Sequence, residues 1–580
     1  MKTSNTIICA ALMLIAAQGQ SLAGSATWAA NPSSGDWNTA ANWTPQTVPS
    51  SSSDVATFAT SSQTQIAVSA ITEVGAIEFN PGAASYTITA ATYPLTLSGS
   101  GVINSSGKLQ TFLCETEDGF NGVFFFKNSA TAGNLTSFGG SESSNFIFYD
   151  TSSAGSAVFD FGGGTLQSDM TFWDSSTAAD ATITAALAVV SFFGGSTAAN
   201  AHITVSDASF VSFDEDAHGG HAVATCIGGN EAYPSDIAFQ DNATAEEGTY
   251  TAVGASAPGE FGSFIELLGS ATADRATFII NGGMGAGLEG TSLIFVDTTT
   301  AANANITANG GVGGSAGGVI SFQEQSKGGK AGVTLNGNSE LDISTHNPPG
   351  VTIGSLAGAG SVLLGANTLT IGSNNQSTTF SGVIQGSGGV TKSGTGTLTL
   401  TGASTYTGTT AVSGGVVKVS NRSGSATGAG ALNVNSGTLG GKGIVAGATT
   451  IGTGSGGGAF LAPAVGTSKQ ATLTIQSALT FNSDATYTCT FQAKKNKAKT
   501  DKVIANGVTI NGAVISLVGQ TQGRLRRGLT LTLISNTSAN PISGSFSNLP
   551  DGGTLTINGN TFQASYSGGD GNDLTLTVVP

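Results

Sequence analysis

Charged side chains are scarce in this sequence, since Asp, Glu, Lys and Arg together make up 9% of the 580 residues. Ordinary globular proteins carry about 25%. Gly alone fills 85 positions, and Gly, Ser and Thr are weak helix formers. A mainly helical fold is therefore excluded. Disorder is not favoured either, because Ile, Val, Leu and Phe recur at alternating positions throughout the chain.

Long apolar runs are also missing. The run at residues 7–17 has about half of the roughly 20 residues that a membrane span needs. It follows Lys2 and precedes Ser21-Leu22-Ala23, which is the arrangement of a secretory signal peptide. We expect cleavage near Ala23, export of the mature chain, and no membrane span in the mature chain.

Cysteine is rare, and Cys9, one of the four, lies in the signal segment. Cys114, Cys226 and Cys489 are separated by more than 100 residues, which matches no zinc or redox spacing. The sequence leaves open whether two of them pair. A framework of several disulfides is excluded.

The net charge of −16 is unevenly distributed. Residues 481–580 contain 8 basic and 5 acidic side chains, a balance of +3, which leaves −19 for residues 1–480. A large acidic surface disfavours nucleic acid and anionic membranes as partners. A cluster of five lysines predicts a solvated loop: Lys494, Lys495, Lys497, Lys499 and Lys502.

An internal repeat becomes visible when the middle of the chain is aligned on its aromatic residues. Similar segments begin at Phe172 (FWDSSTAADATIT), Phe192 (FFGGSTAANAHIT), Phe239 (FQDNATAEEGTYT), Phe295 (FVDTTTAANANIT) and Phe322 (FQEQSKGGKAGVT). Looser or shorter copies begin at Phe126, Phe148, Phe213 and Leu267. Each copy reads as a strand that ends in an apolar residue, a turn of small polar residues, and a second strand.

One such copy cannot fold alone. Its strands bury one or two large apolar side chains, worth about 1.5–3 kcal/mol each, whereas ordering costs about 1–2 kcal/mol per residue. Stacking copies about 4.8 Å apart pairs every strand with its neighbours. We therefore expect an all-β fold: a single elongated parallel β-helix (solenoid), right-handed, with capping segments at both ends. The repeat predicts inward side chains at Phe172, Phe192, Phe213, Phe239, Phe295 and Phe322.

A second motif lies at residues 389–400, GVTKSGTGTLTL, followed by Gly402, Tyr406-Thr407-Gly408 and Thr410. Leu398 and Leu400 point to one side of a strand and the threonines to the other, and the glycines at 394, 396, 402 and 408 supply turns. The segment 389–419 resembles the autotransporter-associated β-strand repeat. Residues 27–58 and 472–574 are similar to the opening and closing segments of the same group of secreted proteins.

The resemblance and the repeat together predict five segments along the chain. These are a signal peptide (1–23), an N-terminal β cap with the first coils (24–110), a solenoid of 20–28-residue repeats (111–345), a solenoid with the autotransporter-type repeat (346–470) and a β-rich closing segment (471–580). A passenger of this family is normally followed by a membrane β-barrel. The sequence stops at Pro580 without one, so we expect the resemblance to extend to the passenger part alone.

The resemblance implies a non-enzymatic structural or adhesive protein that is secreted or lies on the outer cell surface. Its expected partner is a polysaccharide or protein of a cell surface or extracellular matrix, with self-association through solenoid edges or ends as a further mode. The alternative is an extracellular β-helix protein that binds or degrades polysaccharide, because such enzymes place carboxylates on adjacent coils. Five acidic residues follow or neighbour the Phe positions at varying offsets: Asp160, Asp174, Asp214, Asp241 and Asp297.

Two polar clusters are candidate metal sites, and in each a solvated turn is the competing interpretation. The first comprises Asp214, Asp216, His218 and His221, whose oxygen ligands favour calcium and whose imidazoles favour zinc. The second, with Asp570 and Asp573, resembles a single unit of the calcium-binding nonapeptide repeat. Such sites need stacked copies, and this unit occurs once. No cofactor is expected beyond a structural calcium ion at one of these places.

Residues 313–317, Gly-Gly-Ser-Ala-Gly, fit the pattern of a serine hydrolase elbow. That elbow needs a strand-to-helix turn and partner His and Asp residues. The surrounding sequence is rich in Gly and has no helical pattern. The match is therefore interpreted as a chance match, and no catalytic residue is predicted.

Overall fold

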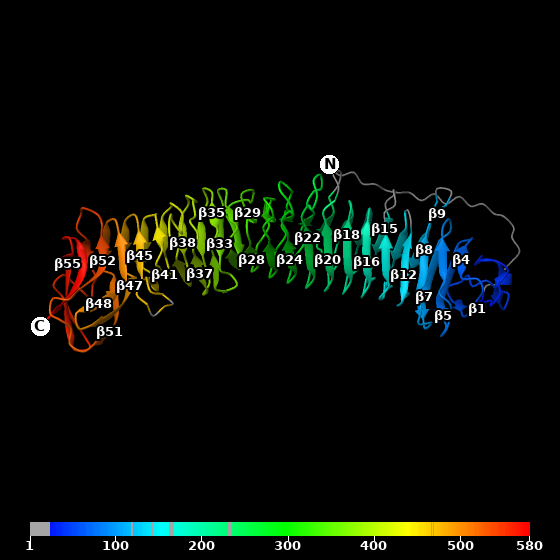
Figure 1. The fold of residues 1–580 in the computed structure, drawn as a ribbon, viewed down its shortest axis with the longest axis horizontal. Coiled ribbons are helices and arrows are strands. Elements are labelled where there is room, and N and C mark those ends of the chain that lie inside the picture. The colour runs from blue at the N-terminus through cyan, green and yellow to red at the C-terminus, as the bar shows by residue number, and fades with distance from the viewer. Residues whose placement is uncertain are drawn as a thin grey trace.

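The chain folds into a rod built from stacked coils of β-strand, as the computed structural model shows (Figure 1). Parallel sheets form a β-solenoid of about 19 turns. The structure describes residues 24–117, 120–140, 143–161, 168–229, 234–465, 467 and 469–580. The predicted signal peptide, residues 1–23, lies outside these ranges. The predicted all-β solenoid is confirmed.

Two long parallel ladders run along the rod, and the coils up to about residue 385 contribute one strand to each of them. Most strands of the first ladder end at an aromatic residue. Its strands are β1 (Ala26–Trp28), β3 (Val55–Phe58), β5 (Thr72–Phe79), β7 (Leu95–Asn104), β11 (Val123–Phe126), β13 (Asn145–Phe148), β15 (Ser168–Phe172), β17 (Ala188–Phe192), β19 (Phe210–Phe213), β21 (Asp236–Phe239), β23 (Phe264–Leu267), β25 (Ser292–Phe295), β27 (Val319–Phe322), β29 (Glu340–Asp342), β32 (Ser361–Leu363) and β35 (Val383–Gln385).

The second ladder continues through nearly the whole rod. Its strands alternate buried and outward side chains, which is the pattern of a sheet with one face in the core. They are β4 (Gln65–Val68), β6 (Thr87–Ala90), β8 (Gln110–Cys114), β12 (Thr136–Gly140), β14 (Val158–Phe161), β16 (Thr182–Ala186), β18 (His202–Ser206), β20 (Val223–Ile227), β22 (Thr249–Val253), β24 (Thr277–Ile280), β26 (Asn305–Ala308), β28 (Gly332–Leu335), β31 (Ser355–Gly358), β34 (Thr378–Phe380), β37 (Thr397–Leu400), β39 (Val416–Val419), β41 (Gly437–Gly441), β44 (Ala459–Ala462), β47 (Ala485–Lys494) and β51 (Val514–Gln522).

A third ladder begins near residue 350, where the coils gain an additional strand. It contains β30 (Gly350–Ile353), β33 (Thr368–Ile371), β36 (Val390–Lys392), β38 (Thr410–Val412), β40 (Leu432–Val434), β43 (Thr449–Ile451), β46 (Leu479–Phe481), β50 (Val508–Asn511) and β53 (Ser543–Ser545). A fourth sheet lies at the C-terminal end. It contains β42 (Ile444–Val445), β45 (Thr472–Ile475), β49 (Lys502–Ala505), β52 (Thr530–Asn536), β54 (Thr554–Ile557), β55 (Asn560–Gly568) and β56 (Asp573–Val579), of which the last three pair in antiparallel hairpins.

The N-terminal end is rich in buried tryptophan. Trp28, Trp37 and Trp43 are at most 1% exposed, and all three rings pack around Phe58. They lie on or beside β1, the one-turn 3-10 helix η1 (Ala40–Asn42) and β2 (Trp43–Thr44). The remaining short strands are β9 (Thr116–Glu117), β10 (Phe120–Asn121) and β48 (Lys497–Thr500).

The aromatic residues of the repeat are stacked inside the rod. Each inward Phe is paired in register with its counterpart one coil away, for example Phe172 with Phe192 and Phe192 with Phe213. The ring centroids of these pairs are 4.7 and 4.8 Å apart, and the ring planes differ by 4° and 6°. All six predicted rings have 0% exposure, so the prediction that they point inward is confirmed. Leu267 takes the same position between Phe239 and Phe295.

The lysine cluster is not a loop, and this part of the sequence interpretation is wrong. Residues 491–500 form an antiparallel hairpin between the end of β47 and β48, which extends from the C-terminal coils. Lys495 lies in its tight turn with φ of +51°. Strong local pairing of the strands, which lysine composition does not reveal, makes the segment regular.

The three cysteines described by the structure are free and buried. Burial raises the pKa of Cys114, Cys226 and Cys489 to about 12 in each case. A thiol with such a pKa carries almost no thiolate at neutral pH and is a poor nucleophile.

Within the described ranges, no helix has the length and hydropathy of a membrane span.

Candidate functional site

A row of acidic residues lies in the first turn of six coils, two positions after the inward aromatic residue. These residues adopt left-handed backbone conformations, with φ of +51° to +58° at Asp150, Asp174, Glu215, Asp241, Asp297 and Glu324. Asp174 accepts a hydrogen bond from the backbone N–H of Asp150 at 3.0 Å, and Asp297 accepts one from Gly269 at 2.8 Å. The carboxylates therefore bind backbone amides of the preceding coil.

This row gives a structural reason for acidic residues that sequence reasoning had considered as enzyme carboxylates. Asp174, Asp241 and Asp297 share the turn position, whereas Asp214 lies one residue earlier and Asp160 lies on the outward face of β14. Short polar side chains tolerate left-handed backbone better than apolar ones and can bond nearby amides. The recurrence of Asp and Glu in this turn is explained by capping between coils.

The second turn uses hydroxyl groups in the same way. The Oγ1 atoms of Thr177 and Thr197 each accept a hydrogen bond at 3.0 Å from the N–H two residues later, on Ala179 and Ala199. Ser153, Thr244, Thr272 and Thr300 repeat the arrangement in their own coils. This regularity explains why Thr recurs in the turn of the sequence repeat.

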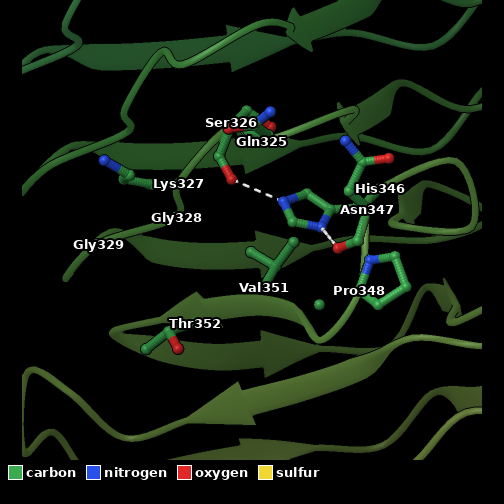
Figure 2. A pocket seen from close by; sticks show the side chains of 11 residues that line it. Gln325, Ser326, Lys327, Gly328, Gly329, His346, Asn347, Pro348, Val351 and Thr352 are labelled. Carbon is green, nitrogen blue, oxygen red and sulfur yellow. Dashed lines mark hydrogen bonds between the residues drawn. The ribbon is translucent and has the colours of Figure 1, made fainter.

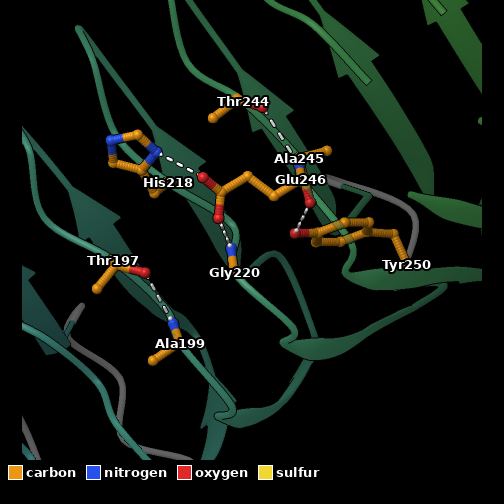
Figure 3. Close-up of polar contacts among 8 residues, drawn as sticks. All are labelled: Thr197, Ala199, His218, Gly220, Thr244, Ala245, Glu246 and Tyr250. Atoms are coloured by element: carbon orange, nitrogen blue, oxygen red, sulfur yellow. Dashed lines mark hydrogen bonds and ion pairs between the residues drawn. The ribbon is translucent and has the colours of Figure 1, made fainter. Parts of the chain in front are cut away.

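His218 breaks the row of hydroxyl caps (Figure 3). It pairs in the ladder with Thr197 and Thr244, but it has no hydroxyl group that could accept a hydrogen bond from the backbone N–H of Gly220. Glu246, from the next coil, takes over: one carboxylate oxygen lies 2.8 Å from His218 Nδ1, and the other accepts the Gly220 N–H at 3.0 Å. The pair is half-buried, with side-chain exposures of 44% and 35%.

The candidate metal residues around His218 have separate partners. Asp216 accepts a hydrogen bond from the Asn242 side chain at 3.2 Å, and His221 lies 3.5 Å from Glu247, which also binds Arg275 at 2.6 Å. Burial raises the pKa of Asp214, and the nearby charges of Asp241 and Glu215 raise it further. Across the residues that the structure describes, no three His, Cys, Asp or Glu side chains converge in a metal-binding group.

The second metal candidate lies in a hairpin turn. Gly568 and Asp573 are paired across the β55–β56 hairpin, and Asp573 accepts the backbone N–H of Asn536 at 2.9 Å. Asp573 is 8% exposed, and its burial raises its pKa. Asp570 is exposed. The segment is thus the turn that feeds the last strand, which was the competing interpretation of this motif.

The hydrolase-like motif around Ser315 lies in the loop between β26 and β27. Ser315 is buried, and its Oγ is within hydrogen-bonding distance of the carbonyl oxygens of Gly283 and Val312. The hydroxyl fastens loops of successive coils to one another. No strand-to-helix elbow surrounds it among the described residues, so the geometry does not fit an activated serine.

A shallow pocket of about 430 Å³ lies beside His346 (Figure 2). Gln325, Lys327 and Pro348 are among its lining residues. His346 Nε2 is 2.8 Å from the carbonyl oxygen of Ser326, and Nδ1 is 2.5 Å from that of Asn347. Both ring nitrogens face backbone carbonyls, so neither is left to serve as a base or a metal ligand towards the pocket.

Sequence reasoning missed a pair of acidic residues on the outer face of the first ladder. Asp236 lies between Phe210 and Phe264 in the register, and Glu266 pairs with Ala238 beside it. Burial, and then the charge of Glu266, raises the pKa of Asp236 to about 7, and burial also raises the pKa of Glu266. The available signal is an acidic residue at an outward position with apolar residues beside it in the neighbouring coils. This signal can be recognised only when the register of the strands is known.

Replacing Asp236 with asparagine is expected to change how stability depends on pH. An unfolded Asp has a pKa of about 3.9, so the folded state holds more protons between about pH 4 and pH 7. The free energy of unfolding of the parent should therefore fall as the pH rises through this window and stop responding to this group above it. At pH 8 the variant should be more stable by on the order of 2 kcal/mol.

Urea unfolding at pH 4.5, 6 and 8 measures this effect on both proteins. Asp180→Asn, at an exposed carboxyl in a turn, is the matched control for the chemical change. Parallel pH profiles of the parent and Asp236→Asn would contradict the assignment.

The segment 389–419 forms parts of two coils through β36, β37, β38 and β39. Leu398 and Leu400 are 1% and 3% exposed, so their predicted inward orientation is confirmed. Tyr406 is fully buried, and its hydroxyl lies 2.6 Å from Thr410 Oγ1. Lys392 is 1% exposed, its Nζ donates to the carbonyl oxygen of Gly394 at 3.3 Å, and burial lowers its pKa.

The glycines of this segment have two different roles. Gly394 adopts a left-handed turn with φ of +64°, as predicted. Gly402 and Gly408 do not need such a conformation. A Cβ at Gly408 would collide with the Gly388 carbonyl of the preceding coil, and a Cβ at Gly430 with that of Gly408. Their requirement for Gly therefore comes from close contact between coils rather than from turn geometry.

Residues 390–419 match the family model of the passenger-associated-transport-repeat. The match lies within the segment singled out in the sequence and coincides with coils of the solenoid. This match and the β-solenoid together fit an autotransporter passenger-like repeat protein. No curated protein matches the sequence. The matched repeat is a small part of the chain, and the other coils share its β-solenoid fold.

Proposed function

We propose that this passenger-like protein is a secreted or cell-surface rod with a structural and adhesive role and without catalytic activity. The observation that carries the proposal is the continuous stack of coils. Its inner face is filled by apolar ladders, and the acidic and hydroxyl side chains of its turns bind backbone amides of their own or neighbouring coils. A rod of this kind displays a long, regular outer surface.

The sequence at residues 1–23 supports export, and the passenger-associated repeat supports a place outside the cell.

A second candidate function is polysaccharide degradation, which Asp236 and Glu266 favour. Two neighbouring carboxyl groups with raised pKa values are the chemistry of a general acid and its partner. The burial of both carboxyl groups also accounts for the raised pKa values without catalysis.

Expression in a Gram-negative host tests the proposed location. The full chain is expected in the medium or on intact cells, where added protease removes it. A variant lacking residues 2–23 should stay inside and be protected from protease until the cells are lysed. A full chain that remains in the cytoplasm would contradict the proposal.

The same purified protein separates the two candidate functions. The structural proposal predicts no turnover of polyuronates, neutral plant glycans or ester substrates with calcium or zinc present. Turnover that disappears in Asp236→Asn and Glu266→Gln would favour the enzyme and assign it to this pair. Turnover that disappears only in the combined Asp214→Ala, Asp216→Ala, His218→Ala and His221→Ala variant would assign it to the turn instead.

A further inference from the structure

A three-stranded sheet face at the C-terminal end of the rod presents six hydrophilic side chains in two rows. The strands β48, β47 and β51 lie side by side, with β47 in the middle. One row is Lys499, Gln492 and Gln520, and the next is Lys497, Lys494 and Gln522. All six side chains are exposed. We call this surface the lysine–glutamine face.

The cations of this face have no acidic ion-pair partner in the part of the chain that the structure describes. The ion pairs among the described residues involve His218, His221 and Arg275 only. Four of the five side-chain carboxyl groups in residues 481–580 accept hydrogen bonds from backbone amides: Asp484 from Gly454, Asp501 from Ala471, Asp551 from Tyr566 and Asp573 from Asn536. The positive charge is therefore left unneutralised.

The arrangement of the lysines is unfavourable for an isolated hairpin. Lys494 and Lys497 are direct cross-strand partners, and like charges in that position destabilise a strand pair. A backbone hydrogen bond of 2.8 Å from the N–H of Arg526 to the carbonyl oxygen of Lys495 brings further positive side chains close to the hairpin. Arg524 and Arg527 flank Arg526 in the same exposed loop. A bound anion would relieve this repulsion.

The glutamine amides of the face indicate which chemical groups, besides anions, the partner carries. Gln492, Gln520 and Gln522 carry both donors and acceptors, which suit hydroxyl groups, whereas the ammonium groups suit carboxylates or sulfates. A shallow groove of about 380 Å³ lies over these side chains. We propose that the lysine–glutamine face binds an acidic polysaccharide, whose chain supplies hydroxyl and anionic groups in alternation.

The six side chains favour this partner over other anionic macromolecules. None of them is aromatic, so the face has no stacking platform for bases and no aromatic anchor of the kind that dominates protein interfaces. They also offer no apolar group to insert into a bilayer. The inference rests on the proposed function, since it names a partner for an extracellular rod. The remainder of the sequence is acidic, with −19 over residues 1–480, and should keep the polysaccharide at this end.

Binding of the full mature chain to size-fractionated polygalacturonate tests the proposal. Neutral dextran and vesicles containing phosphatidylglycerol serve as the comparison probes. The parent should bind polygalacturonate, and the combined variant Lys494→Gln, Lys497→Gln, Lys499→Gln should bind it roughly tenfold or more weakly. Added salt should weaken binding by the parent more steeply than binding by the variant.

A second triple variant controls for net charge. Lys108→Gln, Lys330→Gln, Lys442→Gln removes three exposed lysines outside the face and should bind like the parent. Equal loss in both triple variants, binding to the vesicles but not to polygalacturonate, or no binding by a folded parent would overturn the proposal. A parent that is exported and surface-located but does not bind contradicts this inference alone, whereas a cytoplasmic parent contradicts the proposed function.

Discussion

Replacing Phe192 with alanine is expected to lower the free energy of unfolding by about 3–5 kcal/mol. Phe192 is fully buried, and its ring stacks between Phe172 and Phe213 at 4.7 and 4.8 Å. Truncation leaves a cavity with one coil on each side. The solenoid cannot close this cavity by shortening, because backbone hydrogen bonds along both ladders fix the spacing between coils.

Urea denaturation measures the loss, and hydrogen exchange locates it. The amides of β15, β17 and β19 should exchange faster in Phe192→Ala, while those of β37 should not, because each coil contacts only its neighbours. Phe192→Leu is the matched control and should cost less than about 1.5 kcal/mol. The protein itself places Leu267 at this position one coil from Phe239. A loss in the alanine variant no larger than in the leucine variant would contradict the stacked-core interpretation.

The inward stack was predictable because it depends on residue type alone. An aromatic residue followed by a turn of small polar residues recurs in chain order, so the sequence reveals both the strand end and its buried side. The polar chemistry of the turns was not predictable in the same way. Asp297 caps Gly269, 28 residues earlier, whereas Glu215 caps Gly194, 21 residues earlier, so no fixed spacing marks the partners.

The candidate sites show the same limit. Asp214, Asp216, His218 and His221 are close in sequence, but three of them have separate partners in the turn of the next coil. Asp216, His218 and His221 contact Asn242, Glu246 and Glu247 rather than one another. Asp236 and Glu266 are 30 residues apart and become neighbours only through the β21–β23 register. Proximity in a solenoid is set by coil length, which varies from repeat to repeat.

The hairpin of β47 and β48 was missed for a different reason. Its lysines read as a solvated segment, and they are in fact exposed. What composition does not contain is the pairing of Ala493 with Ala498 and of Phe491 with Thr500 across the hairpin, or the contact of the Phe491 ring with Phe562 at 5.6 Å. Alternation of lysine with small or apolar residues was the available signal.

Replacing Gly408 with alanine is expected to destabilise the coils of the passenger-associated repeat by about 1–3 kcal/mol. Gly388, Gly408, Gly430 and Gly447 are stacked in successive coils, and a Cβ on each of the last three would collide with the carbonyl group of the glycine before it. That carbonyl belongs to backbone held by the ladders on both sides, so it cannot move away without disturbing the hydrogen bonds of two coils. The added methyl group must therefore separate the coils locally.

Gly457→Ala is the control for this experiment, because a Cβ there meets no atom within 4 Å and the residue has no left-handed backbone. It removes the same conformational freedom from the unfolded chain, which by itself stabilises a protein by about 0.4–1 kcal/mol. The two substitutions are thus chemically identical and should have opposite signs in urea denaturation. Hydrogen exchange should place the damage of Gly408→Ala in β36 to β39 and leave β17 unchanged. A Gly408→Ala protein as stable as the parent would mean that the coils can separate at this row of glycines, and the role of Gly in the matched repeat would then have to come from the turns after all.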